Sequence, residues 1–128
     1  MLKAYLVGIS SQYEGEDIEV RYSIYEDQEL LCKESVMMEY RKPGIVGQVA
    51  LITLLKELER YKGKEIVIIV NDAALCEVIR GTSTTKNKDV LNMAKDTREE
   101  LTKFGNPVIK DVSVDRLELA RWNEVLKP

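Results

Sequence analysis

One carboxylate in this sequence directly follows a short apolar run. Residues 65–70 (EIVIIV) lead into Asn71 and Asp72. A side chain at the carboxyl end of a buried strand lies where open α/β sheets place their ligands. Asp72 is therefore the first candidate for a catalytic residue or a metal ligand. Asn and Asp are also good N-caps, so capping of a helix that starts at Ala73 is the alternative role.

The polar loop that follows offers the best local group of phosphate-binding residue types. It extends from Gly81 to Lys88, and Arg80 precedes it. Cations, hydroxyls and amides of this kind contact phosphate oxygens in nucleic-acid complexes. The candidate nucleic-acid-binding residues are Arg80, Thr84, Thr85, Lys86, Asn87 and Lys88. The alternative is an ordinary solvated connection between two helices.

The sequence offers few residues for catalytic or metal sites of other kinds. The chain has no histidine, which excludes histidine metal sites and Ser–His or Cys–His dyads. Cys32 and Cys76 lie in separate hydrophobic segments, and we expect both to be reduced core thiols. The sole tryptophan, Trp122, is expected to anchor a tail helix on the core. A group of acids at residues 14–17 is interpreted either as a weak cation site or as a solvated turn.

Length and composition indicate one globular domain over residues 1–128. The chain is 45% hydrophobic and 32% charged, which argues against disorder. Its net charge of −3 gives no global attraction to phosphate, so nucleic-acid binding would depend on a local basic group. No apolar run approaches the ~20 residues of a membrane span. No signal-peptide pattern is present either, and we expect a cytoplasmic protein without a membrane segment.

The first part of the chain predicts three strands, at residues 3–10, 18–25 and 29–40. Polar turns join them, so an antiparallel meander is expected. In the second strand alternate residues from Ile18 would face the core, and Ser23 would face solvent. In the third strand the core-facing side would hold Leu30, Cys32, Val36 and Met38.

The remainder changes to a helical period. Helices are predicted at 45–61, 73–80, 89–104 and 117–126, and strands at 65–70 and 108–114. A meander followed by two crossover units gives a mixed five-stranded sheet in the order 3-2-1-4-5, with helices on both faces. The fold class is therefore α/β.

The stretch from Glu65 to Arg116 resembles the ribonuclease H-like fold. In that family a central strand ends in an aspartate, a short helix ends in a glycine, and a K-N-x-D-(L/V) segment opens the next helix. Here the corresponding text is EIVIIVND, then AALCEVIRG, then KNKDV at residues 86–90. Asp72 falls on the position of the family's carboxylate at the end of the fourth strand. The first half of the chain agrees in the order of its elements.

The resemblance implies phosphodiester hydrolysis by two divalent metals, Mg²⁺ or Mn²⁺, held by about four carboxylates. The first-strand acid would fall near Gly8 and the first-helix acid near Gly47 and Gln48, where this sequence has no carboxylate. The last helix offers Glu118 or Glu124. We therefore expect no required cofactor; if a metal does bind, Asp72 and Glu124 are its expected ligands.

Three functions remain open from the sequence. The first is a ribonuclease H-like domain without two-metal nuclease activity that binds RNA, DNA or an RNA/DNA hybrid through the Arg80–Lys88 loop. The second is a protein-interaction or self-association module on the same scaffold. The third is a divalent-metal-dependent nuclease with an unusual acid set of Asp72, Glu118, Glu124 and a hairpin acid such as Glu14, Glu16 or Asp17.

Overall fold

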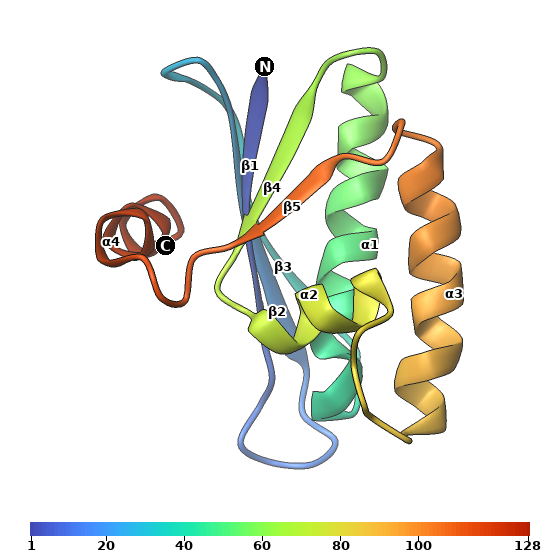
Figure 1. Ribbon diagram of the computed structural model, residues 1–128. Coiled ribbons are helices and arrows are strands. Elements are labelled where there is room, and N and C mark those ends of the chain that lie inside the picture. Colours follow the sequence, from blue (N-terminus) through green and yellow to red (C-terminus); the bar gives the residue numbers. More distant parts are fainter.

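A mixed sheet of five strands forms the centre of the computed structural model, which describes residues 1–128 (Figure 1). The strands follow the order β3-β2-β1-β4-β5. β2 is antiparallel to both β1 and β3, whereas β4 is parallel to β1 and to β5. The predicted topology is confirmed. The strand bounds are β1 Leu2–Ile9, β2 Ile18–Glu26, β3 Glu29–Met38, β4 Ile66–Val70 and β5 Val108–Asp111.

Helices cover both faces of this sheet, as predicted. α1, α2 and α3 lie on one side, and α4 alone lies on the other (Figure 1). No helix combines the length and apolar character that crossing a membrane requires. The bounds are α1 Val46–Leu58, α2 Ala73–Arg80, α3 Lys88–Thr102 and α4 Arg116–Val125. Short 3-10 turns at Pro43–Ile45 and Glu59–Tyr61 flank α1, which is therefore shorter than predicted.

The main core lies between α1 and the sheet. α1 is buried along most of its length, with Leu51, Leu54 and Leu58 inaccessible to solvent. β4 is buried on both faces, which explains its continuous apolar sequence. A second, smaller core on the other face packs Trp122 and Val125 of α4 against Tyr5 and Ile69. The predicted anchoring role of Trp122 is confirmed.

The prediction that Ser23 faces solvent is wrong. Its side chain is completely buried, and its hydroxyl donates a hydrogen bond to the Val125 carbonyl at 2.7 Å. The strand alternation itself is as predicted, with Ile18 and Ile24 in the core. The error arose because α4 covers the face that the alternation assigned to water.

The side-chain assignment at the start of β3 is also wrong. Leu30 is 48% exposed, and Leu31 packs against the main core instead. A bulge causes this change, because Ile24 pairs with Cys32 and Tyr25 pairs with Leu30. The extra residue reverses the faces of β3 on one side of the bulge, which period-two reasoning misses. From Cys32 onward the predicted core-facing side is confirmed.

Candidate nucleic-acid interface

Asp72 lies at the carboxyl end of β4 and is the N-cap of α2. Its Oδ1 accepts a hydrogen bond from the Leu75 amide at 2.9 Å. Its own amide donates to Asp111 Oδ1 at 3.1 Å, which ties the ends of the two parallel strands together. The capping role considered for Asp72 is therefore present. Its second oxygen, Oδ2, is directed toward the start of α1.

A small pocket of about 40 Å³ adjoins Asp72. It lies where the ends of β1 and β4 meet the beginning of α1, so it occupies the ligand position of an open α/β sheet. Asp72 is the one acidic residue in its lining. The other lining residues are Leu6, Val7, Gly8, Gly47, Ala50, Val70, Asn71, Leu75 and Trp122.

Gly47 is the α1 residue that faces the aspartate. A Cβ atom built on Gly47 would lie 2.8 Å from Asp72 Oδ2, closer than real Cβ contacts allow. The side chain of Asp72 thus occupies the space that any larger residue at position 47 would need. Of the two positions considered for the first-helix acid, Gly47 and not Gln48 adjoins Asp72.

Gln48 is buried on the other side of α1, against α3. Its Nε2 donates to the Val90 carbonyl at 3.0 Å, and its Oε1 accepts from Thr97 Oγ1 at 3.2 Å. Both ends of the amide are therefore satisfied inside the core. Gln48 therefore links α1 to α3. The sequence did not predict this role, because both partners lie more than forty residues later in the chain.

Gly47→Ala tests the contact between α1 and Asp72. Gly47 is the second residue of α1, and alanine stabilises a helix relative to glycine by up to about 1 kcal/mol, the value for a helix interior. We expect no gain in the natural background, because the new methyl group displaces Asp72 from its cap. In an Asp72→Ser background, which keeps a capping oxygen but removes Oδ2, the same substitution should stabilise by roughly 0.5–1 kcal/mol. Urea unfolding of the double-mutant cycle measures the difference, and equal gains in both backgrounds would refute the contact.

A larger cleft of about 360 Å³ connects Asp72 with the loop that precedes α3. Thr85 and Asn87 line it from the loop, and Gly44 lines it from the turn before α1. Of the predicted nucleic-acid-binding residues, Thr85 and Asn87 therefore share a cleft with Asp72. Lys86 and Lys88 flank Asn87 along the chain and are exposed. Thr84 is exposed but is not among the lining residues.

The loop is fixed by its own side chains. Asn87 Oδ1 accepts from the amides of Asp89 and Val90 at 3.0 and 3.2 Å, which caps α3. Thr85 Oγ1 accepts from the Asn87 amide at 3.2 Å, and Ser83 Oγ accepts from the Thr85 amide at 3.1 Å. The acceptor atoms are therefore engaged with the backbone. The side-chain N–H groups of Asn87 and the hydroxyl proton of Thr85 remain available as donors.

Three lysines adjoin lining residues of this cleft along the chain, and they differ in their partners. Neither Lys86 nor Lys88 forms an ion pair. Lys42, in contrast, pairs with Asp89, with 3.3 Å between Lys42 Nζ and Asp89 Oδ2. Lys42 was missed by sequence reasoning, because only the packing of the turn before α1 against the start of α3 brings it here. Arg80, in contrast, lines a different pocket between α2, α3 and β5. Sequence proximity placed it with the loop, but Gly81 in a left-handed conformation separates the two.

The acids considered for an unusual metal site lie elsewhere. Glu124 pairs with Lys127 on the exposed side of α4, and Glu118 lines a pocket with Lys3 and Arg121. In the first hairpin, Glu16 accepts a hydrogen bond from the Ser11 hydroxyl at 2.8 Å. No group of three or more Cys, Asp or Glu side chains is arranged to hold a metal ion.

Neither cysteine is an activated nucleophile. Burial raises the pKa of the Cys76 thiol. Burial, together with a hydrogen bond to Glu57, raises the pKa of Cys32 to about 11. The thiolate is the reactive form, so both thiols are expected to be inert near neutral pH. Both are unpaired thiols, as predicted.

Comparison with solved structures identifies the architecture. RNase H1 from the halophilic archaeon Halobacterium salinarum superposes with a TM-score of 0.80 and 18% identity, covering 97% of this chain and 92% of that one. LC11-RNase H1, isolated from compost by a metagenomic approach and solved in complex with an RNA/DNA hybrid, gives 0.79 and 15%, covering 98% and 94%. The N-terminal RNase H domain of a Mycobacterium tuberculosis protein gives 0.74 and 13%, covering 98% of both chains.

Sequence comparison adds nothing to this assignment, since no protein-family model and no curated protein matches the sequence. The identities with the solved structures are low, and what they share with this chain is the fold over nearly its whole length. The strand order and the helix placement agree with it independently. The chain therefore has a ribonuclease H-like fold.

Proposed function

We propose that this chain is a nucleic-acid-binding domain of ribonuclease H-like fold that does not carry out two-metal hydrolysis. One observation carries the binding half of the proposal. The free donor groups of Thr85 and Asn87 line the same cleft as Asp72, and the unpaired Lys86 and Lys88 stand beside them. Donors on a prearranged loop, flanked by cations, match the chemistry of a phosphodiester backbone.

An RNA/DNA hybrid is the ligand that the structural neighbours favour. LC11-RNase H1 was solved in complex with such a hybrid, and a foamy viral protease-reverse transcriptase that also matches this chain was solved with one. Those ligands belong to those proteins. For this chain they support the choice of an RNA/DNA hybrid as the first nucleic acid to test, ahead of DNA duplex and single strands.

The non-catalytic half of the proposal rests on the donor set at Asp72. Two hard cations need several oxygen ligands between them. Here the pocket supplies one carboxylate, one oxygen of which already caps α2. The neighbouring positions are Gly8 and Gly47, which supply no ligand; a Cβ at Gly8 would crowd α1, and the space beside Gly47 is occupied by the Asp72 side chain itself. These residues do not fit a pair of divalent metals, so we propose that the domain needs no metal cofactor.

Removing the two free lysines tests the binding proposal. For Lys86→Ala/Lys88→Ala we expect affinity for a short RNA/DNA hybrid to fall about tenfold at low salt, because each lysine neutralises one phosphate. The slope of log affinity against log salt should decrease in magnitude by about 1–2 for the same reason. Fluorescence anisotropy at several salt concentrations measures both quantities.

A charge-matched variant controls for the general effect of net charge. Lys33→Ala/Lys110→Ala removes two exposed, unpaired cations from β3 and β5, away from the cleft. It should leave both the affinity and the salt slope unchanged. Equal losses in the two double variants, or no measurable binding of hybrid, duplex or single strand by the natural protein at low salt, would refute the proposed interface.

Hydrolysis is tested separately with Asp72→Asn, which keeps the N-cap and the shape of the side chain. We expect no cleavage of labelled RNA/DNA hybrid by the natural protein with Mg²⁺ or Mn²⁺. Cleavage that requires either metal and disappears in Asp72→Asn would establish the nuclease alternative in place of this proposal. Binding without cleavage is the result that the proposal requires.

A protein-interaction role is the second candidate, favoured by two exposed apolar side chains near the start of α4. Val114 is 94% exposed and Leu117 is 85% exposed. Exposed apolar side chains that lie together are typical of protein-interaction sites. Light scattering separates the candidates: a stable oligomer that dissociates on Val114→Ser/Leu117→Ser, combined with no nucleic-acid affinity, would favour this second role.

A further inference from the structure

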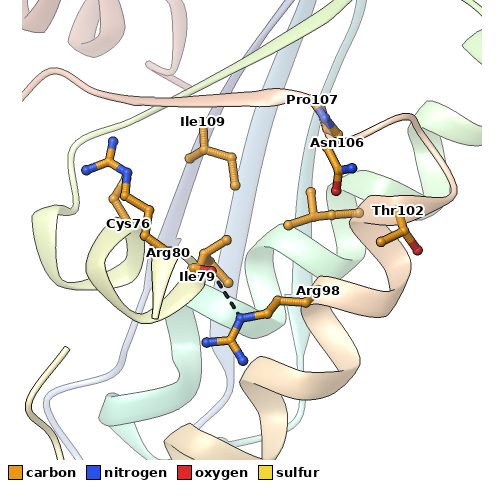
Figure 2. Close-up of a pocket in the computed structure, with 9 residues that line it drawn as sticks. Cys76, Ile79, Arg80, Arg98, Thr102, Asn106, Pro107 and Ile109 are labelled. Carbon is orange, nitrogen blue, oxygen red and sulfur yellow. Dashed lines mark hydrogen bonds between the residues drawn. The ribbon is translucent and has the colours of Figure 1, made fainter. Parts of the chain in front are cut away.

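A separate pocket of about 390 Å³ lies between α2, α3 and β5 (Figure 2). Its volume falls in the range of about 300–1,000 Å³ typical of small-molecule sites. It shares no lining residue with the cleft proposed for nucleic acid. Arg80 stands at one end of it, and Asn106 and Thr102 stand at the other (Figure 2).

The floor of this pocket is apolar. Ile79, Leu101 and Ile109 come from α2, α3 and β5 respectively, and Ile109 points from the strand toward the helices (Figure 2). All three belong to the main core or pack against it, so the floor is a fixed surface. An apolar floor is unsuited to the sugars and phosphates of a nucleic acid. It suits the hydrocarbon part of a small molecule.

Arg98 is held in the wall by the end of α2. Its Nε donates to the Ile79 carbonyl at 3.1 Å, and its Nη2 donates to the Val78 carbonyl at 2.7 Å. These bonds satisfy two carbonyl groups in the last turn of the helix and fix the guanidinium in place. Its Nη1 makes no hydrogen bond and its charge has no carboxylate partner.

Arg80 supplies a second unneutralised charge. It is exposed, lines the pocket and forms no ion pair. At the other end, Asn106 holds a left-handed backbone conformation with φ of 57° and an unengaged carboxamide. The lining of this pocket contains two arginines and no acidic residue. Its positive charge contrasts with the net negative charge of the whole chain.

We propose that this pocket binds a small organic carboxylate with a compact apolar body. The apolar part would lie on the isoleucines and Leu101, and the carboxylate would accept hydrogen bonds from the free guanidinium of Arg80. Arg98, whose Nε and Nη2 donate to backbone carbonyls, would add its positive charge. Guanidinium matches a planar carboxylate in geometry as well as in charge. Asn106 would meet a polar substituent at the far end of the ligand. The proposal is independent of the nucleic-acid interface.

Benzoate and hexanoate serve as probes, with benzamide and hexanamide as neutral analogues of the same shape. In amide chemical-shift titrations of the whole chain we expect saturable changes at residues lining the pocket for the carboxylates at millimolar concentration. The amides should bind roughly tenfold more weakly, because a charge-assisted hydrogen bond is lost. Acetate, which lacks the apolar body, should also bind more weakly than hexanoate.

Variants locate the site. Arg80→Ala should weaken benzoate binding several-fold, and Thr102→Trp, an exposed position at the mouth, should abolish binding by filling the space. Lys110→Ala is the matched control: it removes an exposed cation from β5 whose side chain is not among the lining residues. Equal affinity for benzoate and benzamide, no saturable change with any probe, or displacement of benzoate by an RNA/DNA hybrid would overturn the proposal.

Discussion

Gly8→Asp is expected to lower the free energy of unfolding by more than about 3 kcal/mol, instead of supplying a metal ligand. A Cβ built on Gly8 would lie 3.0 Å from Ala50 Cβ, from Val46 Cγ1 and from the Val46 carbonyl oxygen. The backbone of α1 cannot move away cheaply, because the helix is buried along most of its length. The carboxylate would also begin against the apolar side chains of Ala50 and Val46.

Two further variants separate the causes of this loss. Gly8→Ala adds the steric conflict alone and should cost about 1–3 kcal/mol. Ser10→Asp places the same carboxylate two residues later at an exposed position, where the effect should stay within about 0.5 kcal/mol. Urea unfolding measures all three. A Gly8→Asp protein as stable as the natural one would contradict the close packing of Gly8 against α1 and would leave room for an acid in the pocket.

The fold could be predicted because its signals are local and repeated. Alternation in β2, the apolar run of β4 and the Gly-then-Pro ending after α3 each depend on neighbouring residues. The errors have long-range causes. Ser23 is buried by α4, which comes about a hundred residues later in the chain, and Leu30 is turned outward by a bulge that depends on the register with β2.

The site was predictable to a smaller extent for the same reason. Asp72 and the Asn87 loop were found because a strand end and a helix start have sequence signals of their own. The proximity of Gly47 to Asp72, the inward direction of Gln48 and the approach of Lys42 to Asp89 depend on how α1 packs. For Arg80 the prediction failed in the opposite way: it is next to the loop in sequence, but it lines a different pocket from Asn87.

Trp122→Ala is expected to destabilise the fold by about 3–5 kcal/mol, the usual cost of removing a buried aromatic side chain. The indole is 9% exposed and packs in the smaller core beneath α4. Its Nε1 donates to the Leu6 carbonyl at 2.9 Å, one residue beyond the last β1–β4 pair at Tyr5. Trp122 also lines the pocket beside Asp72. Its loss should therefore loosen the carboxyl ends of β1 and β4, which position Asp72.

The hydrogen bond and the packing of Trp122 can be measured separately. Trp122→Phe keeps most of the apolar contact but leaves the Leu6 carbonyl without its donor, at a cost of about 1–3 kcal/mol. Leu117→Ala removes an exposed side chain from the same helix and should change stability by less than about 0.5 kcal/mol. If α4 were only loosely attached, Trp122→Ala would resemble Leu117→Ala in urea unfolding. A difference of several kcal/mol would establish that this one tryptophan makes a large part of the attachment of α4 to the sheet.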